Sequence, residues 1–195
     1  EDIYSGQYLS EYINTIGSYE GFSSTSPSDY ENATQAIKNA MSEMNGRISN
    51  VDKFYSEYKA AQDKEAVYTD SVGYNQLVAY TDLVAEISKY EGIDVTVLDN
   101  DTLTAITAEI TAATKAMTDR CSTMDKFNSL KADLENMLEQ YSSYDFVDEF
   151  RNTQATYNKG KDLDLIAATD ENLNEAINAF NDAKTALNNK MGAAA

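Results

Sequence analysis

The chain carries one short segment twice, MNGRISNVDKFYS at residues 44–56 and MTDRCSTMDKFNS at residues 117–129. Seven of the 13 aligned positions are identical at a constant offset of 117 − 44 = 73, among them the arginine, the lysine and the phenylalanine. Chance rarely produces such a match in a chain of 195 residues. The sequence therefore indicates an internal repeat, and its architecture can be deduced from one unit.

The composition predicts an all-α protein. Proline occurs once and glycine eight times, whereas alanine, leucine, methionine, glutamate and lysine fill long uninterrupted stretches. The formal charge is −18, from 33 acidic and 15 basic residues. Such a surface repels phosphate backbones and anionic lipid headgroups, so we expect no nucleic-acid partner. No apolar run approaches the roughly 20 residues of a transmembrane helix, so we expect no membrane span in this segment.

One type of helix is predicted three times in a shared register. Apolar side chains recur at steps of 7, 3 and 4 along the chain, which places them on one face of each helix. A capping residue precedes each stripe, and a cation follows it, where we expect the cation to complement the negative pole of the helix. The stripes are Tyr30, Ile37, Ala40, Met44; Leu103, Ile110, Ala113, Met117; and Leu173, Phe180, Ala183, Leu187; the caps are Ser26, Asp99 and Thr169; the cations are Arg47, Arg120 and Lys190.

A second type of helix is predicted over about 49–68 and 122–144. Ser49-x-x-Asp52 and Ser122-x-x-Asp125 have the form of capping boxes, in which Asp replaces the usual Glu. Asn45-Gly46 predicts a true break before the first of these helices. Thr118-Asp119 is a weaker breaker, so residues 118–121 either end a helix or run through as a bend in one long helix.

A third type of helix is predicted over roughly 3–20, 73–91 and 147–159. Its apolar stripes include Ile16 and Ile87, and the first two copies end in Glu20-Gly21 and Glu91-Gly92. Glycine is suited to end a helix because it adopts the left-handed conformation without strain.

These helices group into tandem three-helix-bundle repeats in an elongated array, since each repeat unit packs mainly against its neighbours. The predicted domains are a partial repeat of two helices at 1–45, complete three-helix units at 49–118 and 122–190, and a disordered tail or cloning remnant at 191–195.

Two motifs within this grouping add a family resemblance. Tyr68-Thr-Asp-Ser71 opens a helix, and the pattern Ala168-Thr-Asp-Glu-Asn-Leu173-x-x-Ala176-x-x-x-Phe180-x-x-Ala183-x-x-x-Leu187 closes a unit. In these motifs the chain resembles the FIVAR family, whose three-helix modules occur in arrays on bacterial surface proteins and secreted carbohydrate-active enzymes. Val72 departs from the family pattern, which has an aromatic residue there. The resemblance implies an extracellular bacterial spacer or adhesion module rather than a catalytic domain.

The sequence predicts no catalytic residue, metal site or cofactor. Histidine is absent, no Ser, Lys or Cys stands in a nucleophile motif, and no glycine-rich phosphate loop occurs. The single cysteine, Cys121, is expected to be a small buried side chain. Asp99-Asn-Asp101 and Asp162-Leu-Asp164 lack the glycine of a calcium loop, so we expect structural roles for them.

Tyrosine is the one residue type that points to binding, with 14 copies in the chain. Tyr4, Tyr8 and Tyr12 recur at every fourth position on one helical face of the partial repeat. Left uncovered, this stripe could stack on sugar rings or hold a partner helix; alternatively, the same rings form part of the core.

These observations predict a noncatalytic helical segment of a larger secreted or cell-surface bacterial protein, acting as a spacer or as a stalk that binds a protein or glycan partner. Two alternatives remain open. One is a free-standing surface lipoprotein that binds a small ligand or glycan in a tyrosine-lined groove. The other is a cytosolic scaffold that pairs its helices with a partner.

Overall fold

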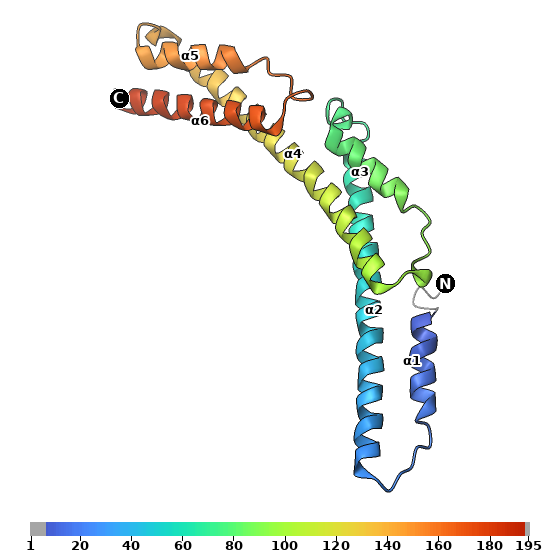
Figure 1. Ribbon diagram of the computed structural model, residues 1–195. Helices are drawn as coiled ribbons and strands as arrows, with labels where there is room; N and C mark the ends of the chain where they lie inside the picture. Colours follow the sequence, from blue (N-terminus) through green and yellow to red (C-terminus); the bar gives the residue numbers. More distant parts are fainter. Residues whose placement is uncertain (1–6, 194–195) are drawn as a thin grey trace. The chain divides into compact units, whose positions relative to one another are not determined.

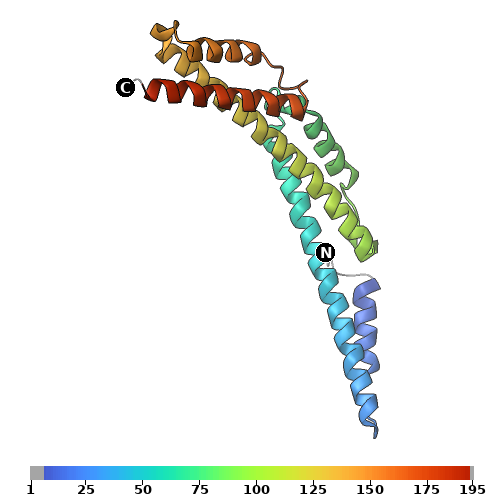
Figure 2. The ribbon, with the colours of Figure 1, turned by 60° about the vertical axis from the view of Figure 1, so that its left-hand side comes forward.

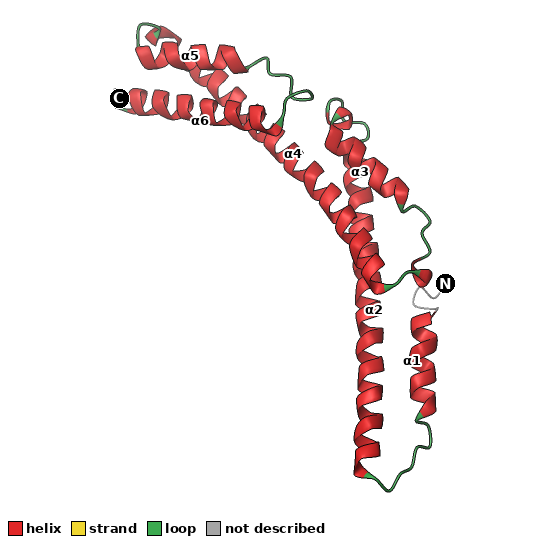
Figure 3. Cartoon of the chain, in the orientation of Figure 1, coloured by secondary structure: helices red, strands yellow, loops and turns green. Residues whose placement is uncertain are grey.

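The described part of the chain, residues 7–193 of a computed structural model, is built from α-helices joined by loops and short 3₁₀ turns, with no strand (Figures 1 and 3). This confirms the all-α prediction. The helices within these residues are α1 (Gln7–Ser18), α2 (Pro27–Tyr68), α3 (Val78–Lys89), α4 (Asn100–Gln140), α5 (Asp148–Gly160) and α6 (Asp170–Gly192). The 3₁₀ turns are η1 (Tyr74–Gln76), η2 (Val95–Val97) and η3 (Ser142–Tyr144).

The two long helices, α2 and α4, have 42 and 41 residues. α2 runs without interruption through Asn45-Gly46, so the predicted break there is wrong. Glycine inside a helix costs about 1 kcal/mol, which packing on either side of it offsets, because Met44 and Val51 are both buried. At residues 118–121 the continuous helix, one of the two forms that we expected, is the observed one. The predicted capping boxes at Ser49 and Ser122 therefore lie inside helices.

The chain divides into two compact units, which are described separately. The first unit contains the residues up to Asp70 together with Thr81–Thr114. In it α1 lies beside the N-terminal half of α2, as Figures 1 and 2 both show. The C-terminal half of α2 meets α3 through Tyr58, whose hydroxyl donates a hydrogen bond of 3.1 Å to the carbonyl of Ile87. Phe54 is 1% exposed, with its ring stacked on Tyr58 at 5.7 Å.

The second unit contains Ser71–Tyr80 and the residues from Lys115 onward. Its core centres on Phe127 of α4 and Phe180 of α6, whose rings stack at 5.3 Å and are each 1% exposed. Gly160 allows the close approach of α5, because a Cβ atom there would lie 2.7 Å from the ring of Phe180. A second cluster fills the far end of this unit, formed by Met137, Phe150, Leu187 and Met191.

Most of the predicted stripes lie in these cores. Leu103, Ile110 and Met117 are fully buried on α4, and Leu173 and Leu187 on α6. Tyr30 is an exception, since it is 47% exposed near the start of α2. Met191 is buried on α6, so the helix extends past residue 190, where we expected a tail to begin.

The helix ends agree in part with the prediction. Asp99 and Thr169 act as caps, since their side chains accept hydrogen bonds from the backbone N–H groups of Thr102 at 2.6 Å and Asn172 at 3.1 Å. Ser26 stands at the cap position before Pro27, but its side chain makes no capping hydrogen bond. Gly21 and Gly92 have φ of 72° and 70°, as predicted for glycines that end helices.

Candidate functional site

Arg47 lies inside the first unit and ties three segments together. Its side chain is only 2% exposed, and its Nη2 donates a hydrogen bond to the backbone carbonyl of Val95 in η2. Its Nη1 lies 3.5 Å from the side-chain oxygen of Asn100, the first residue of α4. Its guanidinium also covers the ring of Tyr8 at 4.8 Å. We call this arrangement an arginine clamp: an arginine inside one helix contacts a loop carbonyl and the first residue of the helix that follows that loop.

Arg120 forms a second arginine clamp inside the second unit. Its Nη2 donates hydrogen bonds to the carbonyls of Leu165 at 2.7 Å and Ala168 at 2.6 Å. Its Nη1 pairs at 2.6 Å with the carboxylate of Asp170, the first residue of α6. The side chain of Arg120 is 10% exposed.

The two clamps use corresponding positions of the sequence. The two arginines are related by the offset of the duplicated segment, 120 − 47 = 73. The accepting carbonyls are related by 165 − 95 = 70, and the helix-starting residues by 170 − 100 = 70. Each clamp thus joins the same three places in the repeat.

The predicted role of Arg47 and Arg120 at helix ends is wrong, because both lie in the middle of long helices. Lys190, the third of these cations, does lie in the last turn of its helix. The signal for the clamps was present in the sequence, since Met44, Arg47 and Val51 share one helical face with spacings of 3 and 4.

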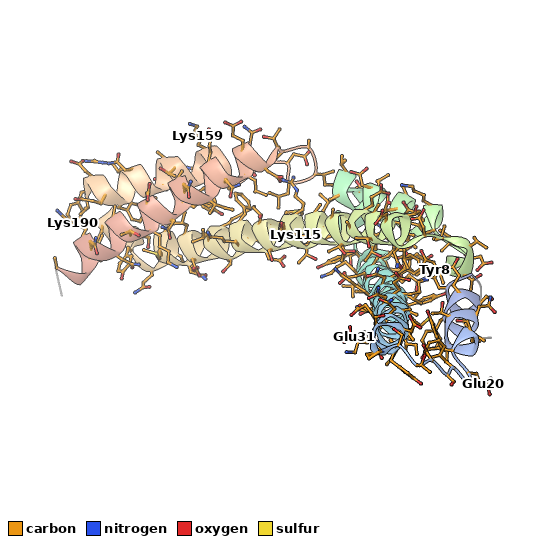
Figure 4. All side chains as sticks on the ribbon, turned by 60° about the horizontal axis from the view of Figure 1, so that its bottom comes forward. Tyr8, Glu20, Glu31, Lys115, Lys159 and Lys190 are labelled. Carbon is orange, nitrogen blue, oxygen red and sulfur yellow. The ribbon has the colours of Figure 1, made fainter. Side chains whose placement is uncertain are left out.

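The predicted tyrosine stripe is placed only in part. Tyr4 lies outside the described residues. Tyr8 is half-buried on α1, and its hydroxyl accepts a hydrogen bond of 3.1 Å from the backbone N–H of Asn100 (Figure 4). This hydrogen bond and the contact with Arg47 give Tyr8 a structural role. Tyr12 is half-buried one turn further along, beside a hollow of about 30 Å³ between α1 and α2. A hollow of that size holds about one water molecule.

Two exposed aromatic clusters lie at turns between helices, and neither was predicted from the sequence. At the α1–α2 turn the rings of Tyr19, Phe22 and Tyr30 meet edge to face at 5.7 and 5.5 Å, and Phe22 is 39% exposed. At the α4–α5 turn Tyr144 lies 6.3 Å from Tyr141 and 6.2 Å from Phe146, which is 68% exposed. The sequence signal for such a cluster is an aromatic residue in a loop, outside any helical spacing of apolar residues.

A charged cluster joins α3 to α4 in the first unit. Lys89 pairs with Glu109 at 2.5 Å, and the hydroxyl of Tyr90 donates a hydrogen bond to the same carboxylate. The donated hydrogen bonds from Lys89 and then Tyr90 lower the pKa of Glu109 from 4.5 to about 2. The carboxylate in turn raises the pKa of Lys89. Both side chains of the ion pair are about half exposed, so the pair is a surface link between helices.

A groove of about 360 Å³ lies between α5 and α6 in the second unit. Its lining includes the apolar side chains of Phe180 and Leu163 and the charged side chains of Lys159 and Glu175. Its volume falls at the lower end of the range for small-molecule sites.

Two of the four carboxylates that we considered for cation binding, Asp99 and Asp164, accept hydrogen bonds from the backbone. The backbone N–H of Thr102 holds the pKa of Asp99 below its usual range, and Asp164 accepts hydrogen bonds from the N–H groups of Ile166 and Ala167 at 2.9 and 3.2 Å. Over residues 7–193 no three histidine, cysteine, aspartate or glutamate side chains lie close enough together to hold a metal ion. Cys121 is buried, as expected.

Comparison with known proteins found no matching family model, no matching curated protein and no matching solved structure. Of the helices that the structure describes, none combines the length and apolar character needed to cross a bilayer.

Proposed function

We propose that this chain is a noncatalytic helical repeat segment of a larger secreted or cell-surface bacterial protein, in which it serves as a spacer or as a stalk that binds a protein or a glycan. The proposal includes the elongated array of tandem three-helix units that the sequence repeat predicts. The observation that carries it is the recurrence of the arginine clamp, at an offset of 73 for the arginines and of 70 for their partners.

The clamp supports an architectural role because the donors of each arginine are bonded to groups of the protein itself. In each clamp the arginine is buried to 90% or more, and its donors are directed at backbone carbonyls of a loop and at the start of the helix that follows this loop. The feature that the chain repeats is thus a way of fixing a loop to a helix. Arrays in which each unit packs against its neighbours tend to keep such contacts from one unit to the next.

The cluster of Tyr19, Phe22 and Tyr30 supports the binding part of the proposal. Exposed aromatic rings offer flat apolar faces with polar edges, which suit sugar rings and protein partners alike. The cluster lies at the turn that joins α1 to α2, and the half-buried Tyr12 lies on α1. We therefore place the proposed binding surface on this pair, with Tyr8 as a structural support rather than a ligand contact.

The groove between α5 and α6 favours a second candidate, the binding of a small ligand by a surface lipoprotein. Its volume and its partly apolar lining fit a small organic molecule. The described lining contains no tyrosine, in contrast to the tyrosine-lined groove that the sequence analysis considered.

Two measurements on the full chain test the proposal. Small-angle scattering should give a radius of gyration clearly above the ~16 Å of a compact chain of this length. A panel of cell-wall glycans and host matrix proteins should contain a ligand that is bound and recovered unchanged. A compact radius would contradict the elongated array, and turnover of a glycan that persists through repurification would contradict a noncatalytic role.

Matched variants locate the binding surface. Phe22→Ser and Tyr12→Ser should abolish binding and leave the helix content unchanged. Tyr55→Ser is the control, because Tyr55 is 39% exposed, as Phe22 is, but lies on the other half of α2. Equal loss of binding in all three variants would argue against a site on α1 and α2.

A further inference from the structure

The N-terminal half of α2 has counterparts in two other helices of the chain. Figures 1 and 2 show it alongside α1, with no third helix among the described residues of this unit running beside the pair. Its residues 30–44 correspond to 103–117 of α4, an offset of 103 − 30 = 73, and these correspond to 173–187 of α6, an offset of 173 − 103 = 70. The same helical face thus occurs in three settings within one chain.

Side chains that are buried on this face of α4 and α6 are open to solvent on α2. Tyr30 is 47% exposed, whereas its counterparts Leu103 and Leu173 are 0% exposed. The same difference holds one and two turns further on, where Thr34 is exposed and Ile37 is half-buried but their counterparts, Thr107 and Ile110 in α4 and Ile177 and Phe180 in α6, are all buried.

In the two buried cases, the element that meets this face is the C-terminal half of the preceding long helix. Phe127, in the C-terminal half of α4, stacks on Phe180 of α6 at 5.3 Å. In the first unit the hydroxyl of Thr111 on α4 donates a hydrogen bond of 3.1 Å to the carboxylate of Glu57, in the C-terminal half of α2. The chain itself therefore shows which kind of element covers such a face.

The two covering halves share one apolar pattern. Buried side chains recur at steps of 3 and then 7 residues, which places them on one side of the helix: Val51, Phe54 and Ala61 in α2, and Met124, Phe127 and Leu134 in α4. Both halves are packed within their own units, so we take the helix that fits the N-terminal half of α2 from another polypeptide. An amphipathic helix with this pattern has the chemistry that the face requires.

The charge at the edge of the face also fits such a helix. Lys38 occupies the position of Thr111, at the offset 111 − 38 = 73, and so would lie opposite the counterpart of Glu57. Lys38 lines an open hollow of about 350 Å³ on α2 together with Tyr30, Thr34 and two neighbouring polar residues, Gln35 and Glu31, the latter labelled in Figure 4. A lysine opposite a glutamate adds an ionic attraction to the apolar contact.

We propose that the face of α2 formed by Tyr30, Thr34, Ile37 and Met41 binds an amphipathic α-helix of another polypeptide. That helix carries the apolar pattern of residues 49–68 and a carboxylate opposite Lys38. The inference rests on the proposed function in placing the binding surface on α1 and α2. It adds the chemistry of the partner, which is a helix that completes a three-helix core and not a sugar.

The test adds a peptide of residues 49–68 to the full chain. Hydroxyl-radical labelling measures the accessibility of Met41, which is 47% exposed, and Met117, which is 0% exposed, gives the labelling of a buried methionine. We expect labelling of Met41 to fall several-fold toward that of Met117 as the peptide concentration rises. The matched control is the same peptide with Phe54→Ser, which should leave Met41 labelled.

An exchange of charges tests the register of the helix. Lys38→Glu in the protein should weaken binding of the peptide by about two- to five-fold, and Glu57→Lys in the peptide should restore binding to that variant. Tyr30→Ser should weaken binding by about tenfold. Val97→Ser is the control, because Val97 is 76% exposed in the same unit but lies in η2. Fluorescence anisotropy of a labelled peptide measures all of these affinities.

Three results would overturn the inference. The first is unchanged labelling of Met41 at a peptide concentration of about 1 mM. The second is binding that neither Tyr30→Ser nor Lys38→Glu weakens. The third is protection of Met41 by a glycan and not by the peptide, which would leave the proposed function in place because that function includes glycan binding. Scattering and turnover of the full chain, which test the proposed function, are independent of these results.

Discussion

The guanidinium of Arg120 pairs with the carboxylate of Asp170 at 2.6 Å, and so a residue in the middle of α4 holds the first residue of α6. The two carbonyl contacts made by the same side chain, at Leu165 and Ala168, fix the loop that leads into α6. In the first unit Arg47 has the same relation to Val95 and to the start of α4. Each of these helix starts is thus contacted by one arginine from a distant helix.

Removing either arginine should lower stability. Arg47→Met keeps the length of the side chain but leaves the buried carbonyl of Val95 without its donor, so we expect a loss of about 2 kcal/mol in the free energy of unfolding. Arg120→Met should cost a similar amount. Arg151→Met is the control, because that side chain is 59% exposed and pairs with Asp148 of its own helix; its effect should stay within about 0.5 kcal/mol. Urea unfolding that gave equal losses in all three variants would argue against the clamps.

Two glycine substitutions should have opposite signs. Gly46→Ala places a methyl group in open space inside a continuous helix, so it should stabilise the protein by about 0.5–1 kcal/mol. Gly160→Ala places a Cβ atom 2.7 Å from the buried ring of Phe180, and should destabilise the protein by about 1–3 kcal/mol. Thermal and urea unfolding measure both. Destabilisation by Gly46→Ala would show that residues 45–46 break the helix after all.

Phe54 and Phe127 should be equivalent in energy as they are in sequence. Each is 1% exposed, one in each unit, and each stacks on a second aromatic ring. Truncation of either to alanine should cost about 3–5 kcal/mol in the free energy of unfolding. A denaturation midpoint within experimental error of the parent for either variant would exclude that residue from the core.

The Glu109 cluster predicts a specific acid sensitivity. The pKa of Glu109 is lowered from 4.5 to about 2 in the folded protein by the hydrogen bonds from Lys89 and Tyr90. A group with a lowered pKa stabilises the folded state above its ordinary pKa, and this contribution is lost as the pH falls from 4.5 toward 2. Carbon-detected NMR titration should place the midpoint of Glu109 near 2. In Lys89→Met the midpoint should rise toward 4.5, and a midpoint that does not move would exclude Lys89 as the main cause.

The sequence predicted the helices better than their ends. The stripes on α4 and α6 follow the helical period because one face of each is buried, and most of their members lie in a core. The helix break predicted at Asn45-Gly46 was wrong because the local helix propensity of glycine costs only about 1 kcal/mol. The packing of Met44 and Val51 on either side stabilises the helix as a whole. Such packing depends on segments distant in the sequence.

The candidate site was less accessible to prediction. The spacing of Tyr8 and Tyr12 identified one face of α1, but not that the hydroxyl of Tyr8 accepts the N–H of Asn100, because that contact joins residues 92 positions apart. Arg47 and Arg120 were assigned to helix ends because a cation after an apolar stripe is common there. Their partners are loop carbonyls and the side chains of Asn100 and Asp170, which lie 53 and 50 positions away in the sequence, so the arginine's own helical face does not identify them.

The uninterrupted course of α4 determines where this chain can change its length. One residue inserted in the middle of that helix would turn every side chain beyond it by about 100° and carry Met117, Met124 and Phe127 off their common face. One residue inserted in the loop between α5 and α6 would turn no helix face at all. Natural variation and engineered insertions, such as epitopes or labels, should therefore be confined to the loops, and the long helices should vary in composition but not in number of residues.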